Sequence, residues 1–349
     1  MDIFTHPDFD GHEQVVFADD PAAGLRAVIA VHDTRLGPAL GGCRIWAYRT
    51  EAEAVTDVLR LSRGMSYKAA LAGLPLGGGK SVMMIAPDRP KTPIMMRAMG
   101  RAVERLAGRY IVAEDVGATV ADMDEIATET HHVSGLSGGA GDPSPWTARG
   151  VLLALEAAAR HKLGRGLSGL RVTVTGLGHV GASLVAQLLD AGAEVAVADI
   201  RPEAVAAALA QGAARSIAPE AAHRVPADVF APCALGAGLN AITIPEIAAP
   251  IVCGAANNQL ATPADGLRLQ ARGILYAPDY LVNAGGLISV ARPVTGLSDA
   301  AAKARLEAIP RTLMEIFAAA DADGIPPDAA ADRIARARIG AGRATAAAV

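Results

Sequence analysis

Residues 172–181 read VTVTGLGHVG, and this stretch decides the fold of the C-terminal half of the chain. A β-rich run ends at Gly176, the glycines follow the pattern GxGxxG, and a helix is expected over residues 179–189. A second apolar run, residues 195–198, ends at Asp199. Strand, glycine turn, helix and acidic residue in this order predict a βαβ unit that binds a dinucleotide.

Each position of this motif has its own expected task. Gly176 permits the tight turn, Gly178 lets the backbone approach a pyrophosphate at the helix N-terminus, and Gly181 lets helix and strand pack closely. Asp199 can accept hydrogen bonds from the adenosine ribose and would repel a 2′-phosphate, which favours NAD over NADP, although Arg201 is close by in sequence. The predicted cofactor-binding residues here are Gly176, Leu177, Gly178, His179 (a solvent-facing spacer), Val180, Gly181 and Asp199.

Further short apolar runs follow at residues 229–232, 251–253 and 274–277, separated by helix-length segments, as in a doubly wound parallel sheet. The N-terminal half mixes strands with helices. A strand is expected over residues 25–31, and helices over 51–63 and 92–106. Thr50 and Glu53 form a capping-box pattern at the first helix, and Pro93 suits the first turn of the second.

Residues 134–147 are dense in Gly, Ser, Asp and Pro and predict an irregular boundary, followed by a helix over 148–160. We therefore expect an α/β protein of two domains with an active-site cleft between them. Residues 1–133 would form a substrate-binding and catalytic domain, completed by a C-terminal helix within 325–349. Residues 134–324 would form a Rossmann dinucleotide-binding domain.

Composition excludes several classes of protein. The 349 residues are 51% hydrophobic and 19% charged, with a net charge of -4 and no basic run, which argues against nucleic acid or anionic membranes as partners. No stretch reaches the length of a membrane span, and Cys43, Cys233 and Cys253 suit reduced thiols in the cytoplasm. No metal site is expected, because there is no CxxC pair and His131 and His132 are adjacent.

Two lysines stand in a region that is otherwise almost free of charge. Lys80 follows three glycines, but five residues separate Gly73 from Gly79, so the spacing fails the P-loop pattern of nucleotide triphosphatases. The glycines suggest that another group approaches the backbone there. If Lys68 and Lys80 lie together and partly desolvated, the pKa of one is lowered and that lysine can act as a general base. Solvated surface lysines are the plainer alternative.

Asp115 lies at the end of a predicted strand, a favoured place for a catalytic acid or base. A turn or helix cap is the alternative role, and the neighbouring Glu114 competes for the catalytic one. The residues alone leave this choice open.

At these positions the chain resembles the glutamate/leucine/phenylalanine/valine dehydrogenase family, in particular its leucine, valine and phenylalanine branch. The resemblance covers nearly the whole length. The segments that carry it are 40–44, 57–68, 77–80, 113–117, 141–145, 176–181, 254–259 and 283–286.

The resemblance implies NAD-dependent, reversible oxidative deamination of an amino acid, in a homo-oligomer. It implies that Lys68 holds the substrate carboxylate, that Lys80 activates water, and that Asp115 shuttles protons. By the same resemblance Asn258 binds the carboxylate and Gly41 and Gly42 admit the substrate backbone. The remaining cofactor-binding residues that it implies are Ala255, Asn257 and Asn283.

The family's side-chain pocket falls on five apolar positions, Leu40, Met65, Ala113, Leu287 and Val290. Glutamate is disfavoured, because its distal carboxylate would need a cationic partner when buried. The resemblance favours leucine, valine and isoleucine, with phenylalanine as the alternative substrate. Trp146 and Leu287 depart from the small residue and the valine usual in the family. A non-catalytic NAD-binding regulator is the alternative outside enzymes, and the presence of Lys68, Lys80 and Asp115 argues against it.

Overall fold

The computed structural model describes residues 2–86, 88, 90–139 and 141–346. They form two compact units, each with its own sheet. Unit 1 comprises Met1–Gly141, Val290–Leu297 and Ala335–Val349, and unit 2 comprises Asp142–Ser289 and Ser298–Ile334. The predicted α/β fold with two domains is confirmed. The boundaries after residues 133 and 324 and the cleft stay predictions.

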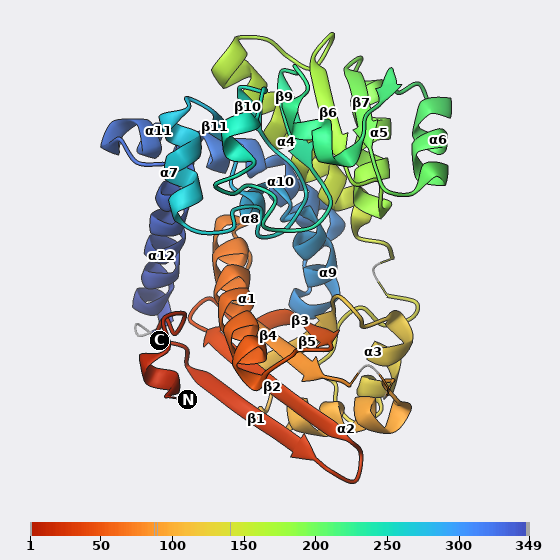
Figure 1. Cartoon of the computed structure of the whole chain (residues 1–349). Coiled ribbons are helices and arrows are strands. Elements are labelled where there is room, and N and C mark those ends of the chain that lie inside the picture. The colour runs from red at the N-terminus through yellow and green to blue at the C-terminus, as the bar shows by residue number, and fades with distance from the viewer. Residues whose placement is uncertain (1, 87, 89, 140, 347–349) are drawn as a thin grey trace. The chain divides into compact units, whose positions relative to one another are not determined.

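Unit 1 contains a five-stranded sheet with the strand order β1-β2-β4-β3-β5 (Figure 1). Strand β2 pairs antiparallel with β1 and β4, whereas β3 pairs parallel with both β4 and β5. The strands are β1 (Gln14–Asp20), β2 (Leu25–Asp33), β3 (Ala39–Trp46), β4 (Gly77–Met84) and β5 (Tyr110–Glu114).

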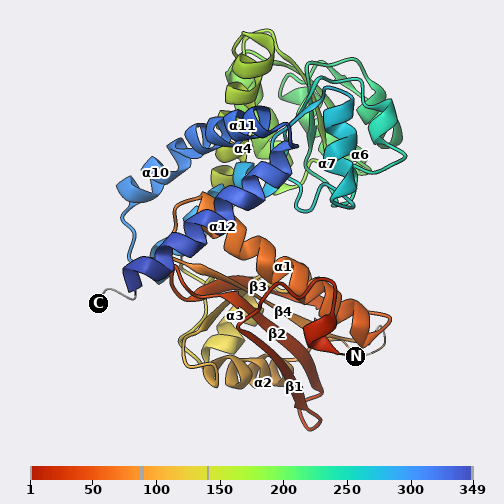
Figure 2. The same ribbon diagram turned by 90° about the vertical axis from the view of Figure 1, so that its left-hand side faces the viewer.

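Helices cover both faces of this sheet, with α1 on one side and α2 and α3 on the other (Figure 2). Along β2, Val28 and Ala30 pack in the cluster that contains α1. The alternate residues Ala27, Ile29 and Val31 pack with α2 and α3. A strand that is buried on both faces is apolar throughout, which is why this run was recognisable in the sequence. The helices are α1 (Glu51–Leu71), α2 (Pro93–Glu104) and α3 (Val120–Ala127).

Helix α1 begins where predicted but runs eight residues beyond the predicted end at residue 63. The Thr50 hydroxyl accepts the Glu53 N–H at 3.2 Å, which is the first hydrogen bond of a capping box. In the second, the Glu53 carboxylate accepts the N–H of Arg49 at 3.1 Å, in place of the N–H of Thr50. The predicted end was wrong because tertiary packing continues the helix: Ser66 and Tyr67 are buried.

Unit 2 contains a six-stranded sheet whose strands are all parallel, in the order β11-β10-β9-β6-β7-β8, as predicted. The order reverses at β6, which has β7 on one side and β9 on the other. Ligands of such sheets bind beyond the strand ends at this switch point. The strands are β6 (Arg171–Thr175), β7 (Glu194–Ala198), β8 (Arg215–Ser216), β9 (Val229–Pro232), β10 (Ile251–Val252) and β11 (Leu275–Tyr276).

Helix α4 begins at Ser144, so the end of the segment predicted to be irregular, residues 134–147, is helical. Pro145 is tolerated there because the first turn of a helix needs no internal N–H donor. Two helices contribute residues to both units, α9 (Gly285–Thr295) and α12 (Pro327–Ala346). The other helices of unit 2 are α4 (Ser144–Leu163), α5 (His179–Asp190), α6 (Pro202–Ala210), α7 (Ala264–Ala271), α8 (Asp279–Val282), α10 (Asp299–Glu307) and α11 (Ile309–Asp323).

Candidate active site

The predicted catalytic residues Lys80 and Asp115 meet within unit 1. Lys80 lies on β4 and Asp115 directly follows β5, with β3 between the two strands. The Lys80 Nζ lies 2.9 Å from the Asp115 Oδ2. Lys80 is only 5% exposed, and a buried ion without a partner would lose its hydration uncompensated. Of the two candidate acids, the structure therefore brings Asp115 rather than the exposed Glu114 to the lysine.

Arg44 is a charged neighbour of this pair that sequence reasoning missed. Its Nε donates to the same Asp115 Oδ2 at 2.9 Å, and its Nη1 donates to both oxygens of Asp57 at 3.2 and 2.9 Å. The Tyr48 hydroxyl donates to the Asp57 Oδ2 at 2.6 Å. A single arginine in an otherwise apolar strand, two residues after Gly42, was the available signal.

These contacts decide the charge state of the Asp115 carboxyl. Burial alone raises its pKa, but the charges of Lys80 and Arg44 outweigh burial and hold the pKa below its usual range. The pKa of Arg44 is raised in turn, because the charges of Asp115 and Asp57 outweigh its own burial. Asp115 is therefore a carboxylate at neutral pH.

The glycines around the pair leave no space for side chains. A Cβ at Gly41 would lie 1.7 Å from the Gly79 carbonyl oxygen, and one at Gly79 would lie 2.6 Å from the Tyr110 ring. The fully buried Tyr110 hydroxyl donates to the Gly41 carbonyl at 2.7 Å. The expectation that another group approaches the backbone before Lys80 is confirmed. The packing of β3 against β4 thus requires glycine at position 41. That Gly41 also makes room for the substrate backbone stays a prediction.

The same argument applies to Gly42, whose Cβ would lie 2.7 Å from the Asp115 Cβ. At Gly42, β3 and the predicted catalytic residue Asp115 therefore approach too closely for a side chain. A Cβ at Gly78 would lie 2.0 Å from the Ser66 backbone nitrogen, so β4 and α1 touch there. The half-buried Lys68 lies two residues after Ser66 on α1, a spacing that turns its side chain to another side of the helix.

The five predicted pocket positions divide between the units. In unit 1, Leu40 is buried on β3, Ala113 pairs with Gly42 across the β3–β5 ladder, and the half-buried Met65 lies one turn before Lys68 on α1. The Val290 carbonyl accepts the Ser134 hydroxyl at 3.2 Å. Leu287 is buried on α9 in unit 2. All five side chains are apolar and uncharged.

In unit 2, the dinucleotide motif occupies the turn between β6 and α5. Gly176 has a φ of +87°, and its Cβ would lie 2.7 Å from the Ala234 nitrogen. A Cβ at Gly181 would lie 1.9 Å from the Gly176 carbonyl oxygen. Gly178 faces open space with no atom within 4 Å of a Cβ, beside the first N–H groups of α5. This cradle fits a pyrophosphate, as predicted for a dinucleotide cofactor.

The other predicted cofactor-binding positions of the motif lie around the same turn, and only His179 among them was expected to be a solvent-facing spacer. The exposed His179 and the half-buried Val180 begin α5, and the Leu177 N–H donates to the Asp199 Oδ2 at 2.5 Å. Asp199 follows β7 and is also bound by Arg201, through its N–H at 2.8 Å and its Nε at 3.1 Å. The Arg201 hydrogen bond, more than any other contact, lowers the pKa of Asp199 to about 2. Asp199 is therefore always ionised under physiological conditions.

A second polar group lies beyond the ends of β10 and β11. The Asn283 Nδ2 donates to the Ala255 carbonyl at 3.0 Å and to the Asn257 Oδ1 at 2.8 Å. Its Oδ1 is buried and has no hydrogen-bond partner among the described residues. Such an acceptor fits an amide donor such as a nicotinamide carboxamide. Asn258 has a φ of +53° and donates its N–H to the Asp279 Oδ2 at 2.7 Å.

Trp146 lies in the first turn of α4 and is half-buried. A Cβ at Gly285 would lie 2.0 Å from its carbonyl oxygen, so the start of α9 packs closely against the backbone of this residue. Nothing in the structure assigns Trp146 a part in the predicted pocket.

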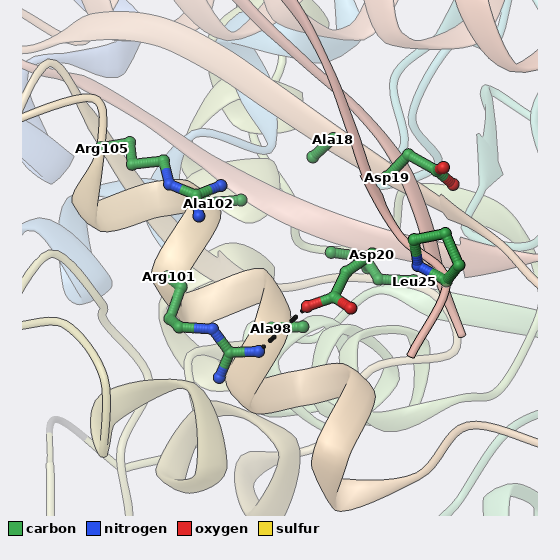
Figure 3. A pocket seen from close by; sticks show the side chains of 9 residues that line it. Ala18, Asp19, Asp20, Leu25, Ala98, Arg101, Ala102 and Arg105 are labelled. Atoms are coloured by element: carbon green, nitrogen blue, oxygen red, sulfur yellow. Dashed lines mark hydrogen bonds and ion pairs between the residues drawn. The ribbon is translucent and has the colours of Figure 1, made fainter. Parts of the chain in front are cut away.

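A hollow between the β1–β2 hairpin and α2 shares no residue with these groups (Figure 3). Arg101 on its wall binds Asp20 at 3.1 Å and Glu129 at 3.2 Å. Among the described residues there is no cluster of His, Cys, Asp and Glu that could hold a metal ion. In the same part of the chain no helix is long and apolar enough to cross a membrane.

The chain is similar in sequence to known proteins. Residues 12–132 match the family model "Glu/Leu/Phe/Val dehydrogenase, dimerisation domain", and residues 203–319 match "Glutamate/Leucine/Phenylalanine/Valine dehydrogenase". Leucine dehydrogenase from Geobacillus stearothermophilus is 47% identical, covering 97% of this chain and 94% of that enzyme. Valine dehydrogenase from Streptomyces virginiae is 50% identical, covering 96% of this chain and 95% of that enzyme.

Among solved structures, L-tryptophan dehydrogenase from Nostoc punctiforme superimposes with a TM-score of 0.84 at 40% identity, covering 95% of this chain and 97% of that one. These relatives are all amino acid dehydrogenases, and the residues of the two units fit a dinucleotide and an acid–base pair. The chain therefore belongs to the glutamate/leucine/phenylalanine/valine dehydrogenase family, as an oxidoreductase that acts on an amino acid with a nicotinamide cofactor.

Proposed function

We propose that this protein catalyses the NAD-dependent, reversible oxidative deamination of branched-chain L-amino acids to their 2-oxo acids and ammonium. The observation that carries the proposal is the buried contact between Lys80 and Asp115. It supplies a base and a proton carrier 2.9 Å apart, in the unit that also contains four of the five apolar pocket positions, Leu40, Met65, Ala113 and Val290. Acid–base groups must lie within such reach of the protons that they move.

The residues of the chain divide the work. Lys68 holds the substrate carboxylate, and Asp115 moves protons to and from the substrate nitrogen. Lys80 first releases its own proton, the one proton that the net reaction sets free, and in its neutral form then removes a proton from the water that attacks the imine carbon. A nicotinamide dinucleotide, when bound, would supply the acceptor for the hydride of the substrate Cα. Water addition and loss of ammonium then give the 2-oxo acid. Gly176, Gly178 and Gly181 would hold the pyrophosphate, and Asn283 and its neighbours the nicotinamide end.

The preference for NAD rests on Asp199. Its carboxylate, ionised at all relevant pH values, would accept the ribose hydroxyls and repel a 2′-phosphate. Arg201 supports this preference in its present position, because its guanidinium is bound to Asp199 through Nε and Nη2.

The choice of branched-chain substrates rests on the apolar positions. A glutamate side chain would bring an unpaired carboxylate against Leu40, Ala113 and Val290, at a cost of several kcal/mol, about the desolvation penalty of one ion. The leucine and valine dehydrogenases among the relatives support aliphatic substrates. The tryptophan dehydrogenase makes aromatic substrates the competing outcome.

The proposed assembly is a homo-oligomer in the cytoplasm. Two observations support it: the N-terminal family model describes a dimerisation domain, and Cys43 and Cys253 are buried free thiols. Size-exclusion chromatography with light scattering measures the number of subunits.

The test is a substrate panel with the purified full-length chain. L-Leucine, L-valine, L-isoleucine, L-phenylalanine, L-tryptophan and L-glutamate are each offered with NAD or NADP, and formation of the reduced cofactor is followed. The expected result is the highest kcat/KM for an aliphatic substrate with NAD. A higher value for phenylalanine or tryptophan would overturn the substrate proposal. Binding of NAD without turnover of any amino acid would leave a regulator in place of an enzyme.

A further inference from the structure

We propose that Arg44 is a positioning residue that holds the Asp115 carboxylate by one oxygen, Oδ2, beside Lys80 and leaves the other oxygen, Oδ1, for the substrate. This inference rests on the proposed function, in which Asp115 is the proton carrier. It concerns how that carrier is oriented, which neither the family match nor the relatives' names describe.

The first support is that both cations share one oxygen. The Lys80 Nζ and the Arg44 Nε each lie 2.9 Å from the Asp115 Oδ2. Within the described residues, no hydrogen bond or ion pair reaches Oδ1. A carboxylate whose one oxygen is fixed by two charged donors cannot rotate freely, because rotation would break both charge-assisted hydrogen bonds. The Asp115 side chain keeps 21% of its surface exposed, so the cluster does not bury it completely.

The second support is that Arg44 is itself held at its far end. Its Nη1 binds both oxygens of Asp57 on α1, and the Tyr48 hydroxyl binds the Asp57 Oδ2. The planar, rigid fork of arginine suits a bridge between two carboxylates, whereas a lysine ammonium is a single point charge. Arg44 therefore connects α1 to the end of β5 through two carboxylates, and the orientation of Asp115 depends on both.

The third support is the balance of charge. Two cations, Lys80 and Arg44, face two carboxylates, Asp115 and Asp57, in alternating order. During deamination one proton passes from the substrate ammonium to Oδ1, and the same proton returns to the leaving amine. Asp115 thus ends the reaction as it began, while Arg44 stays charged throughout because guanidinium does not deprotonate in proteins. Arg44 moves no proton itself.

The matched control is Arg101. Like Arg44, it is a partly exposed arginine that bridges two carboxylates in unit 1, here Asp20 and Glu129, and Figure 3 shows its bond to Asp20. Its carboxylates have no predicted catalytic task. If activity were lost only because an arginine that joins two carboxylates is missing, the variants of Arg44 and Arg101 would both lose activity.

The experiment measures kcat, KM and thermal unfolding for Arg44→Ala, Arg44→Lys, Asp57→Asn and Arg101→Ala, with the amino acid that the wild type turns over best. For Arg44→Ala we expect kcat to fall by about 100-fold, as for a catalytic group displaced by about 1 Å, with an unchanged KM for the cofactor. Millimolar guanidinium should restore part of the lost kcat in Arg44→Ala. Arg44→Lys should be intermediate, and Arg101→Ala should keep the wild-type kcat.

The proposal is overturned if Arg44→Ala retains the wild-type kcat. It is also overturned if guanidinium and Arg44→Lys both fail to restore any activity, because the role of Arg44 would then be structural. If Arg44→Ala does not fold, Arg44→Lys and Asp57→Asn test the proposal instead. A wild-type kcat in both of these variants would contradict the positioning role of Arg44. Absence of turnover in the wild type would instead refute the proposed function, so the two failures are distinguishable.

Discussion

The two units build their candidate sites from different material. In unit 2 the site consists of backbone, namely a glycine turn and the start of α5, with one carboxylate at the end of β7. In unit 1 it consists of charged side chains from β3, β4, α1 and the residue after β5. Backbone sites are encoded in a short run of sequence, whereas this charge cluster joins residues such as Arg44 and Asp115 that are 71 positions apart.

The largest effect is expected for Lys80→Ala. Loss of the base should lower kcat by about 1,000-fold or more, within the range of general acid–base catalysis, while the Kd of NAD stays within about twofold of the wild type. Steady-state kinetics and NAD fluorescence quenching measure the two quantities, with the exposed Lys162→Ala as control. If Lys80→Ala also lost affinity for NAD, catalysis and cofactor binding would not be divided between unit 1 and unit 2.

Two glycines of the motif test the backbone site. Gly181→Ala should lower the free energy of unfolding by about 1–3 kcal/mol, because its Cβ would overlap the Gly176 carbonyl oxygen. Gly178→Ala has open space and should stay within about 1 kcal/mol of the wild type. Both should weaken NAD binding, which calorimetry measures alongside thermal unfolding. Wild-type NAD affinity in Gly178→Ala would contradict a pyrophosphate at this residue.

His32 is a buried histidine of unit 1 whose pKa is lowered by its surroundings. His32 donates to or accepts from the Ser66 hydroxyl at 2.8 Å, and Asp10 lies 3.8 Å away. Burial, and next the charge of the neighbouring His12, lower its pKa from 6.5 to about 4. The Asp10 charge does not compensate for burial, so His32 is neutral at pH 7. Lys80, Arg44, Asp115 and Asp57, in contrast, form ion pairs with one another.

The sign of the pH dependence follows from this shift. Between about pH 6.5 and about pH 4 the unfolded chain binds more protons at His32 than the folded protein does. Its contribution to the free energy of unfolding is therefore complete above pH 6.5 and is lost as the pH falls, by about 3 kcal/mol in total. His32→Gln should flatten urea-unfolding stabilities over this range, and the exposed His131→Gln should not. If the free energy of unfolding of His32→Gln changed with pH as steeply as that of the wild type, a group other than His32 would bind the proton.

The smallest effect is expected for Asp199→Asn. Loss of the negative charge should reduce the ratio of kcat/KM for NAD to that for NADP by about tenfold, which corresponds to 1.4 kcal/mol. Arg201, released from Asp199, would then be able to reach a 2′-phosphate. The exposed Asp190→Asn, at the end of α5, is the control. Equal ratios in wild type and Asp199→Asn would show that this carboxylate does not select the cofactor.

What could be predicted from the sequence was local. The glycine turn at Gly176 and the acid at Asp199 depend on residues close in sequence, and the parallel sheet depends on short apolar runs. The strand containing Gly77 and Lys80 was not recognised, because glycine has little strand propensity and its place in β4 is set by the packing of Tyr110 and Ser66. Arg44 was missed for a related reason: its partners come from other elements.

The choice between Glu114 and Asp115 illustrates the same limit. Adjacent residues at a strand end point in different directions, and only the position of β4 decides which one meets Lys80. No spacing rule within the segment contains that information.

The close approach of β3 to β4 at Gly41 and Gly79 limits how the substrate range of this protein can be redesigned. A library that randomises every position around Lys80 would spend much of its diversity on chains that cannot fold, because a side chain at Gly41 would collide with a carbonyl oxygen. Directed evolution should hold both glycines fixed and vary Leu40 and Ala113, where side chains of other sizes can be accommodated by repacking.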